Sequence, residues 1–448
     1  MLADYNNLPI GKRRKEAMKA SISGWMGTAL EFYDFLVFGY LATILAPLFF
    51  PSSNPTTSFI ELFAVFGVGF VMRPLGAIIF GWIGDRYLGR RRTLMITIFL
   101  MGTVSVGMGL LPTYASIGVY ATILLVIFRL LQGLALGGEF GGAITLTAEL
   151  SPRESRGFYI GISQMAQGGF IPSALVAIFT RIMTHAELVS YGWRILFILG
   201  VVIAVVGFVV RLKISGSPYL NDLKEKKKLA KMPIITAWKK YPLKMLLGII
   251  IVAGATVITY TFSTYGITYL EIYENFSIAS ASLILTIATG LFMILTPLWS
   301  FLSDRFGRKV FIVLTPLLLL IVVYPAYILM GTGVFAIALL AYILVYAIYS
   351  LENGPYGTVL SEIYPTEVRY TGVSFSYNLA VGLFGGFSPL IVTVLIAITK
   401  NKLAPIIWLV PFLAVSLIVI LIFYKETKGE DFSEEQNAAI VTPKGASK

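Results

Sequence analysis

The chain has 448 residues, of which 57% are apolar and only 13% are charged, about half the charged share of a soluble domain. This composition excludes an ordinary soluble protein and predicts a helical membrane protein with many spans. The net charge of +12 does not indicate nucleic acid, because the basic residues flank apolar runs on one side of the predicted membrane. Without cysteine, disulfides and thiolate metal sites are excluded.

Twelve apolar runs, each near the ~20 residues that cross a bilayer core, predict twelve transmembrane helices. In the first half they cover 20–50, 57–83, 93–111, 117–149, 155–183 and 192–213. In the second half they cover 242–270, 277–302, 309–329, 333–361, 369–398 and 403–424. The predicted domains are an amino-terminal segment 1–19, a six-helix bundle 20–213, a lysine-rich linker 214–241, a second bundle 242–424 and a tail 425–448.

The basic residues predict the orientation. Of the 35 Lys and Arg residues, 29 fall on the side of the amino end, the linker and the tail, four fall on the other side and two lie inside the membrane. Since basic loops stay in the cytoplasm, we expect both termini there and the protein in the plasma membrane.

An internal repeat relates the two halves. The charged loop 81–92 lies between two apolar runs, and a similar loop, 300–309, recurs in the second half with Asp304 in the place of Asp85. The pattern E-x-x-P-x-E-x-R runs from Glu149 to Arg156 and again from Glu362 to Arg369. Two motifs repeated in the same order predict two parallel six-helix halves with a binding site between them near the midplane.

These repeated segments are the candidate gate. We expect each loop aspartate to contact a helix end or an arginine of the repeated E-x-x-P-x-E-x-R pattern, in mirror-image networks. A solvated loop that only fixes topology is the alternative. The candidate gating residues are Gly81, Asp85, Arg86, Arg90, Glu149, Arg156, Asp304, Arg305, Arg308, Glu362 and Arg369.

Both loops resemble the signature loops of the major facilitator superfamily. The stretches 27–35, 73–76, 129–142 and 149–157 resemble one subfamily, the metabolite:proton symporters, whose members move carboxylates or zwitterions such as proline and betaine with protons. The tail 425–429 resembles instead the close of sugar porters, without their preceding proline. The resemblance implies an all-α membrane protein with twelve transmembrane helices in two pseudo-symmetric bundles.

Five ionisable residues lie deep inside the apolar runs of the first half: Glu31, Asp34, Arg73, Arg129 and Glu139. At 1.5 Å per residue, all but Arg129 lie at similar depth, ~15–21 Å from the cytoplasmic helix ends. A charge at that depth costs at least ~2.5–3.5 kcal/mol, so each is expected to face the interior and find a partner. Three acids stand against two arginines, so one acid can be protonated without leaving both arginines unpaired.

Two interpretations of this cluster stay open. In the functional one, an acid carries the coupling proton, and Arg73 or Arg129 binds a substrate carboxylate. In the other, static ion pairs lock the helices together; it is disfavoured because buried ion pairs are expensive. Asp34, within expected reach of Arg73, is the first candidate for the proton and Glu139 the second, while Glu31 is expected to partner an arginine.

Further candidate substrate contacts are spread over both halves. They are Tyr33, Gln164, Glu352, Asn353 and Asn378. Glu352 corresponds to Glu139 in the repeat and opens the stretch Glu-Asn-Gly-Pro, which either loosens the backbone at a cavity or kinks a packed helix. The polar amides serve either as contacts or as links between helices.

The function expected is proton-coupled symport of a small organic anion by alternating access. A sugar or polyol porter is the first alternative, and a membrane sensor without transport is the second. No nucleophile–base motif, metal cluster or phosphate loop indicates an enzyme, and no cofactor or metal is expected. The expected partners are a small-molecule substrate, protons and the lipid bilayer, not nucleic acid, and the chain is expected to be monomeric.

Overall fold

The computed structural model describes residues 8–212, 217–225 and 232–432. Within these ranges the chain forms helices and loops and no strand. Eleven helices are long and apolar enough to cross a membrane, and the pair α2 and α3, bent by 70°, makes a twelfth span. The predicted all-α membrane fold is therefore confirmed.

The first half contains the first six spans. Its helices are α2 (Ile10–Tyr40), α3 (Ala42–Phe49), α4 (Pro55–Ile83), α5 (Arg90–Gly109), α6 (Tyr114–Ile117), α7 (Val119–Leu136), α8 (Glu139–Leu150), α9 (Arg156–Gln164), α10 (Phe170–Ile182), α11 (His185–Glu187) and α12 (Trp193–Arg211). Short tight turns of 3-10 type, η2 (Arg153–Ser155) and η3 (Met165–Gly168), and short wide turns of π-helical type, η1 (Gly84–Leu88) and η4 (Leu188–Gly192), extend several of them. The first span begins well before its predicted start, because the basic stretch before residue 20 continues the same helix.

Two short helices, α13 (Pro218–Glu225) and α14 (Pro233–Lys240), lead to the second half. It consists of α15 (Pro242–Thr259), α16 (Gly266–Tyr273), α17 (Ile278–Phe306), α18 (Arg308–Met330), α19 (Phe335–Ile363), α20 (Arg369–Ala380), α21 (Ser388–Thr399) and α22 (Pro405–Phe423). Wide turns η5 (Tyr260–Thr264) and η6 (Val381–Gly385) interrupt two of its spans. Such wide turns inside helices frequently mark functional sites.

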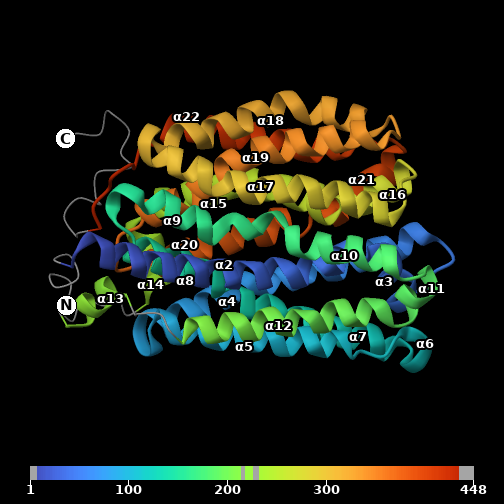
Figure 1. Cartoon of the computed structure of the whole chain (residues 1–448), viewed down its shortest axis with the longest axis horizontal. Helices are drawn as coiled ribbons and strands as arrows, with labels where there is room; N and C mark the ends of the chain where they lie inside the picture. The colour runs from blue at the N-terminus through green and yellow to red at the C-terminus, as the bar shows by residue number, and fades with distance from the viewer. Residues whose placement is uncertain (1–7, 213–216, 226–231, 433–448) are drawn as a thin grey trace.

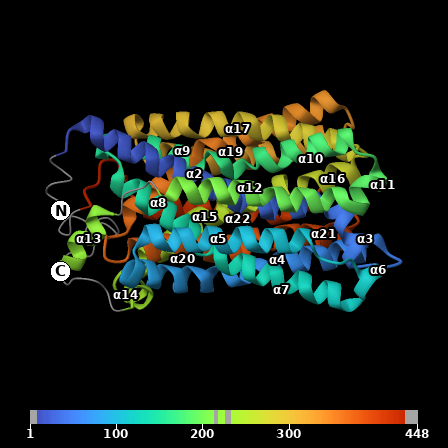
Figure 2. The ribbon, with the colours of Figure 1, turned by 60° about the horizontal axis from the view of Figure 1, so that its bottom comes forward.

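The two halves lie side by side with their helices along a common axis (Figure 1). We call the end that carries α13 and α14 the linker end; α3, α6 and α11 lie at the opposite end (Figures 1 and 2). Between the halves, α9 packs against α17 and α19, while α20 packs against α4 and α8. This interface positions the candidate site.

The outer surface is apolar, as a lipid environment requires. Phe99, Ile182 and Ile398 expose 70%, 71% and 74% of their surface, although a soluble protein rarely leaves large apolar patches in water. The charged residues deep within the spans point inward instead: Arg73, Arg129 and Glu139 are buried. Polar groups therefore gather where the helices meet.

Candidate functional site

An ion pair in the centre of the molecule joins the first two spans. Arg73 on α4 is paired with Glu31 on α2, and both side chains are 1% exposed. The Nε of Arg73 also donates to Oδ1 of Asn378 on α20 at 2.9 Å. The expectation that Glu31 partners an arginine agrees with this pair. Because Asn378 belongs to the second half, Arg73 bridges the two halves.

Asn378 is itself fixed across the interface. Its amide nitrogen donates to the backbone oxygen of Gly137, between α7 and α8, at 2.9 Å and to that of Ser374 on its own helix at 2.8 Å. The rings of Phe70 and Tyr377 lie 5.3 and 5.6 Å from the guanidinium carbon of Arg73. Arg73 is therefore held by an acid, an amide and two aromatic faces.

A small central cavity lies between the halves. It measures about 10 Å³, roughly the room for one water molecule. Residues from five spans line it: Phe32, Gln167, Val252, Ala255, Thr256, Thr259, Tyr260, Tyr349, Tyr356, Tyr377 and Val381. A metabolite does not fit this cavity, so the conformation is an occluded one.

The sequence interpretation missed most of this lining, above all its tyrosines. Tyr349, Tyr356 and Tyr377 lie in apolar runs whose aromatic residues carry no periodic signal of their own. The available signal was weak: Tyr349 and Tyr356 flank Glu352, the charge buried in that run.

Asp34 faces away from Arg73, so the expected proximity is not met. Its Oδ1 accepts from the Ser105 hydroxyl on α5 at 2.5 Å, and that hydroxyl also contacts the Phe197 carbonyl at 2.8 Å. Positions i and i+3 on a helix differ by a rotation of about 60° around its axis. That rotation directs Glu31 toward α4 and Asp34 toward α5 and α12.

Arg129 occupies an aromatic cage. Its guanidinium carbon lies 3.5 Å from the centre of the Phe38 ring, 4.9 Å from Phe35 and 5.7 Å from Phe66. Its Nη1 donates to Gln132 at 2.7 Å, but its Nε and Nη2 are buried without a hydrogen-bond partner among the described residues. Cation–π contacts replace a carboxylate here.

Glu139 has a partner that sequence reasoning missed. It forms an ion pair with Arg211 at the end of α12 and accepts from Thr97 at 2.9 Å. Arg211 also donates to the Leu94 carbonyl at 2.5 Å. Arg211 lies in the last turn of an apolar helix, so the sequence interpretation counted it among the basic residues on the cytoplasmic side. Its long side chain instead reaches inward. The cluster thus has three arginines for three acids.

Other candidate contacts divide between the interface and the bundle interior. Asn353 donates to the Gln164 carbonyl at 3.2 Å, and Tyr356 donates to Gln167 at 2.8 Å, so α19 is tied to the fifth span. Tyr33 instead donates to the Leu196 carbonyl on α12 and does not line the cavity. Helix α19 continues through its Gly-Pro pair without a break.

At the linker end, the repeated motifs meet in two matching networks. Glu149 is paired with Arg90 of its own half and with Arg369 of the other half, the latter at 2.9 Å. Glu362 is paired with Arg308 of its own half at 3.3 Å and with Arg156 of the other at 3.1 Å. Each glutamate therefore ties its own half to the other.

The second loop aspartate closes the same end. Asp304 accepts from the backbone N–H groups of Gly157 and Phe158, both at 2.9 Å, where α9 begins and its unpaired N–H groups favour an anion. Arg308 pairs with it at 2.7 Å. The side chain of Asp85, its counterpart in the first loop, lies outside the described residues.

The remaining loop candidates lie at the edge of this network. Arg86 and Arg305 are exposed and stack on Tyr87 and Phe301 of their own loops. Gly81 faces α20 so closely that an added Cβ would lie 3.1 Å from the Thr371 hydroxyl. An alanine there would press on the Thr371 hydroxyl, so the small glycine eases the close approach of α4 to α20.

The tail, which the sequence interpretation left out of the gate, crosses the network. Thr427 donates to Glu362 at 2.8 Å. The ring of Phe432, 2% exposed, lies between Arg156 and Arg369, whose guanidinium carbons are 3.7 and 3.6 Å from its centre. Burial and nearby Glu362 raise the pKa of the tail residue Glu430. The tail thus bridges the two halves.

The opposite end is closed by aromatic and hydroxyl contacts. The hydroxyls of Tyr40 and Ser263 lie 2.6 Å apart across the interface. Phe63 and Tyr265 meet edge to face with ring centres 5.6 Å apart. Both ends are therefore shut over the central cavity, and either can open only if contacts between the halves break.

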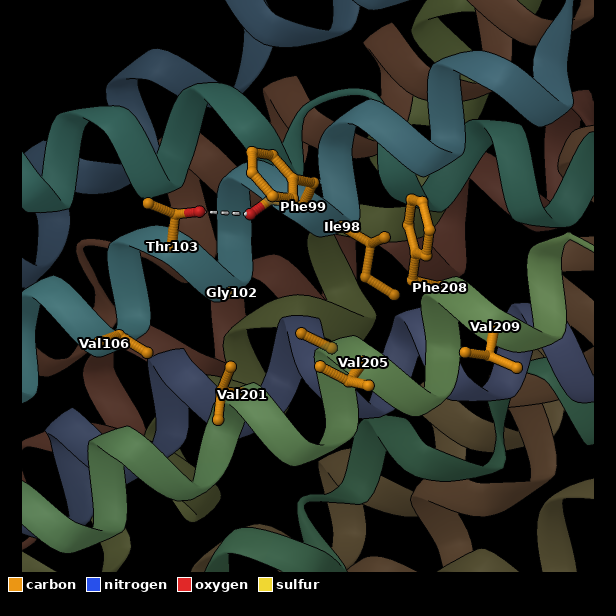
Figure 3. Close-up of a pocket in the computed structure, with 10 residues that line it drawn as sticks. Ile98, Phe99, Gly102, Thr103, Val106, Val201, Val205, Phe208 and Val209 are labelled. Atoms are coloured by element: carbon orange, nitrogen blue, oxygen red, sulfur yellow. Dashed lines mark hydrogen bonds between the residues drawn. The ribbon is translucent and has the colours of Figure 1, made fainter.

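A much larger hollow lies elsewhere and is not a candidate substrate site. It is a groove of about 570 Å³ between α5 and α12 (Figure 3). Apart from Thr103, whose hydroxyl donates to the Phe99 carbonyl at 2.9 Å, its side chains are apolar, and Phe99, Val205 and Val209 are exposed on the outer surface. Such a groove suits lipid chains.

Comparison with known proteins yields matches over nearly the whole chain. The family model described as "Major Facilitator Superfamily" matches residues 30–389 and 275–446. The "Proline/betaine transporter" of Escherichia coli (strain K12) is 31% identical over 433 residues, covering 93% of this chain and 84% of that protein. The "Citrate-proton symporter" of Klebsiella pneumoniae is 34% identical over 391 residues, covering 86% of each.

Among solved structures, the proton:xylose symporter XylE bound to 6-bromo-6-deoxy-D-glucose superposes with a TM-score of 0.76. The alignment covers 94% of this chain and 98% of that one, at 19% sequence identity. At that identity the similarity concerns the fold.

Proposed function

Since this chain belongs to the Major Facilitator Superfamily, a family of membrane transporters, we propose that it is a proton-coupled symporter of a small organic anion. The observation that carries the proposal is the position of Arg73, which contacts Glu31 in one half and Asn378 in the other beside the central cavity. A ligand that engages Arg73 acts directly on the interface between the halves.

Arg73 is the proposed anchor for the substrate carboxylate. A guanidinium binds a carboxylate through two parallel hydrogen bonds, and a substrate carboxylate would compete with Glu31 for the same group. Arg129, with two buried N–H groups unpaired among the described residues, is the second candidate. Gln164, Glu352, Asn353 and Asn378 stay proposed contacts around the cavity.

Asp34 is the proposed carrier of the coupling proton. It has no ion pair among the described residues, and its second oxygen, Oδ2, is buried without a hydrogen bond. A carboxyl group in such a place is easily held neutral. Glu139 and Glu31 are the alternatives, although each is paired with an arginine.

The networks of Glu149 and Glu362 at the linker end are the proposed gate. They hold that end closed, and they must break for it to open. Because the excess of basic residues lies on this side, we place the linker end and both termini in the cytoplasm, and the monomeric protein in the plasma membrane.

A zwitterion is a second candidate substrate. The cavity is lined by Tyr260, Tyr349, Tyr356 and Tyr377, and the faces of such rings bind quaternary ammonium groups. A zwitterion would keep its carboxylate on Arg73. A neutral sugar has no use for that arginine and is disfavoured; a sensor that does not transport is the remaining alternative.

The test is uptake into proteoliposomes that contain the purified full-length protein. Citrate, succinate, glycine betaine, proline and xylose are offered in parallel, with and without an imposed pH gradient. Accumulation of an organic acid that requires the gradient supports the proposal. Gradient-driven uptake of xylose alone would overturn the anion assignment, and no uptake of any compound would favour the sensor.

A further inference from the structure

Glu352 is a buried carboxylate with no evident neutralising group. Its side chain on α19 is 2% exposed, and the described residues supply it with neither an ion pair nor a hydrogen bond. It lies eleven residues before the helix end at Ile363, ~16 Å along the axis. This depth places it near the midplane, far from the charged linker end.

The neighbours of Glu352 connect it to the central cavity. Tyr349 and Tyr356 lie three residues before and four residues after it, on the same helix face, and both line the cavity. Their hydroxyls have other partners: Tyr349 accepts from Thr259 at 2.6 Å, and Tyr356 donates to Gln167 at 2.8 Å.

The described elements packed against α19 provide no cation at this depth. Their charged residues are Asp304 and Arg305 on α17, Arg308 and Lys309 on α18, Arg156 on α9, Lys244 on α15, Glu139 and Glu149 on α8, and Arg369 on α20. All except Glu139 lie within the first or last few residues of their helices at the linker end. Glu139 is an acid and already has Arg211.

The repeat shows what the second half lacks. Glu139, the counterpart of Glu352 in the first half, forms an ion pair with Arg211 and accepts a hydrogen bond from Thr97. At the offset that relates Glu139 to Glu352, Arg211 corresponds to Tyr424, a neutral side chain bound to Thr427 at the linker end. The second half therefore has the acid, but it has a tyrosine at the position where the first half has the arginine that pairs with that acid.

We propose that Glu352 is a proton-binding site in the second half, protonated in the occluded, substrate-free state. An ionised carboxylate at the membrane centre costs at least ~2.5–3.5 kcal/mol unless a cation compensates it, and protonation removes that charge. When the cavity opens to either side, the carboxyl group exchanges its proton with water. No other reactant is needed.

This inference deepens the proposed symport and rests on it for its biological meaning. Together with Asp34 in the first half, Glu352 would give each half one acid that can bind a proton. Glu352 lies next to tyrosines that line the cavity, whereas Asp34 lies inside the first bundle. Loss of the proton from Glu352 would place a charge next to the tyrosines and disfavour re-closure of an empty cavity. Glu352 would therefore hold a proton each time the cavity closes, while Asp34 remains the proposed carrier of the coupling proton that is released.

The test is infrared difference spectroscopy of the purified full-length protein, reconstituted in lipid and stepped in pH without any substrate. A protonated carboxyl group has a carbonyl stretch that a carboxylate lacks. We expect such absorption at neutral pH in the wild type, and we expect Glu352→Gln to lose the part of it that Glu352 contributes. Absorption from Asp34, the other proposed protonated acid, should remain in this variant. Glu352→Asp, which keeps a carboxyl group, should retain a shifted band.

Glu139→Gln is the matched control, because Glu139 is an equally buried glutamate that has Arg211 as its cation; the variant should leave the band of Glu352 intact. An unchanged band in Glu352→Gln, or no such band in the wild type, would overturn the proposal. The measurement requires no transport. If Glu352→Gln loses the band but no compound is taken up with protons, the proton site stands and the symport proposal fails.

Discussion

Phe432 is predicted to act as a clasp at the linker end, and replacing it with alanine should favour opening there. The ring lies between Arg156 of the first half and Arg369 of the second, 3.7 and 3.6 Å from their guanidinium carbons. Separating the halves breaks at least one of these contacts. The ring therefore stabilises only the closed state.

The size of the effect follows from burial and cation–π contact. Phe432 is 2% exposed, so its removal forfeits ~1.5–3 kcal/mol of transfer free energy, and each guanidinium contact adds ~0.5–1 kcal/mol. Burial and one guanidinium contact, the minimum broken on opening, sum to ~2–4 kcal/mol. Losing this stabilisation of the closed state would raise the ratio of open to closed molecules by ~30- to ~700-fold. Phe432→Leu should give a smaller change, because it keeps most of the apolar surface.

Pairs of spin labels can measure this ratio cleanly, since the chain has no cysteine of its own. Labels on cysteines at the exposed positions 92 and 306 report the distance between the halves at the linker end. Phe423→Ala, a lipid-facing phenylalanine that is 43% exposed, is the control. If Phe432→Ala and wild type give the same distance distribution, the clasp is refuted.

Four other predictions test the site. Arg73→Lys should lower carboxylate binding by at least ~10-fold, because lysine cannot make the paired hydrogen bonds; equal affinity for citrate and betaine in the two proteins would contradict it. Asp34→Asn should abolish pH-driven accumulation while exchange across the membrane continues, and accumulation against a gradient would exclude Asp34 as the carrier. Arg211→Met should destabilise the protein by ~3–5 kcal/mol because it strands Glu139; thermal unfolding should improve again when Glu139→Gln is added. Burial in the docked tail raises the pKa of Glu430 above 4.5, so docking favours its protonated form. Tail docking should therefore weaken as the pH rises through the raised pKa. A spectroscopic label on the tail should report this undocking in the wild type and show no such pH dependence in Glu430→Gln.

The gate contacts illustrate what a repeated motif can predict. Glu149 and Glu362 occupy equivalent helix ends in the two halves, and each contacts the arginine that closes the other copy of the motif. Exchange of partners between two related halves is a consequence of two-fold pseudo-symmetry. The repeat thus predicted two mirror-image networks, with Glu149 and Arg156 in the same one, whereas the structure exchanges the two arginines between them. The role of the networks in transport is a proposal for experiment.

The sequence by itself determined the number of spans, the repeat and the position of Glu31, Asp34 and Arg73 along their helix axes, because helix length and rise fix position along the axis. Only the tertiary structure decided rotation about that axis. Helices in lipid are apolar on every side, so no hydrophobic face indicates which neighbour a residue meets. Asp34 consequently meets Ser105 rather than Arg73, Arg211 reaches inward to Glu139, and the tail inserts Phe432 between the halves. Contacts between distant segments depend on packing that periodicity within one helix does not encode.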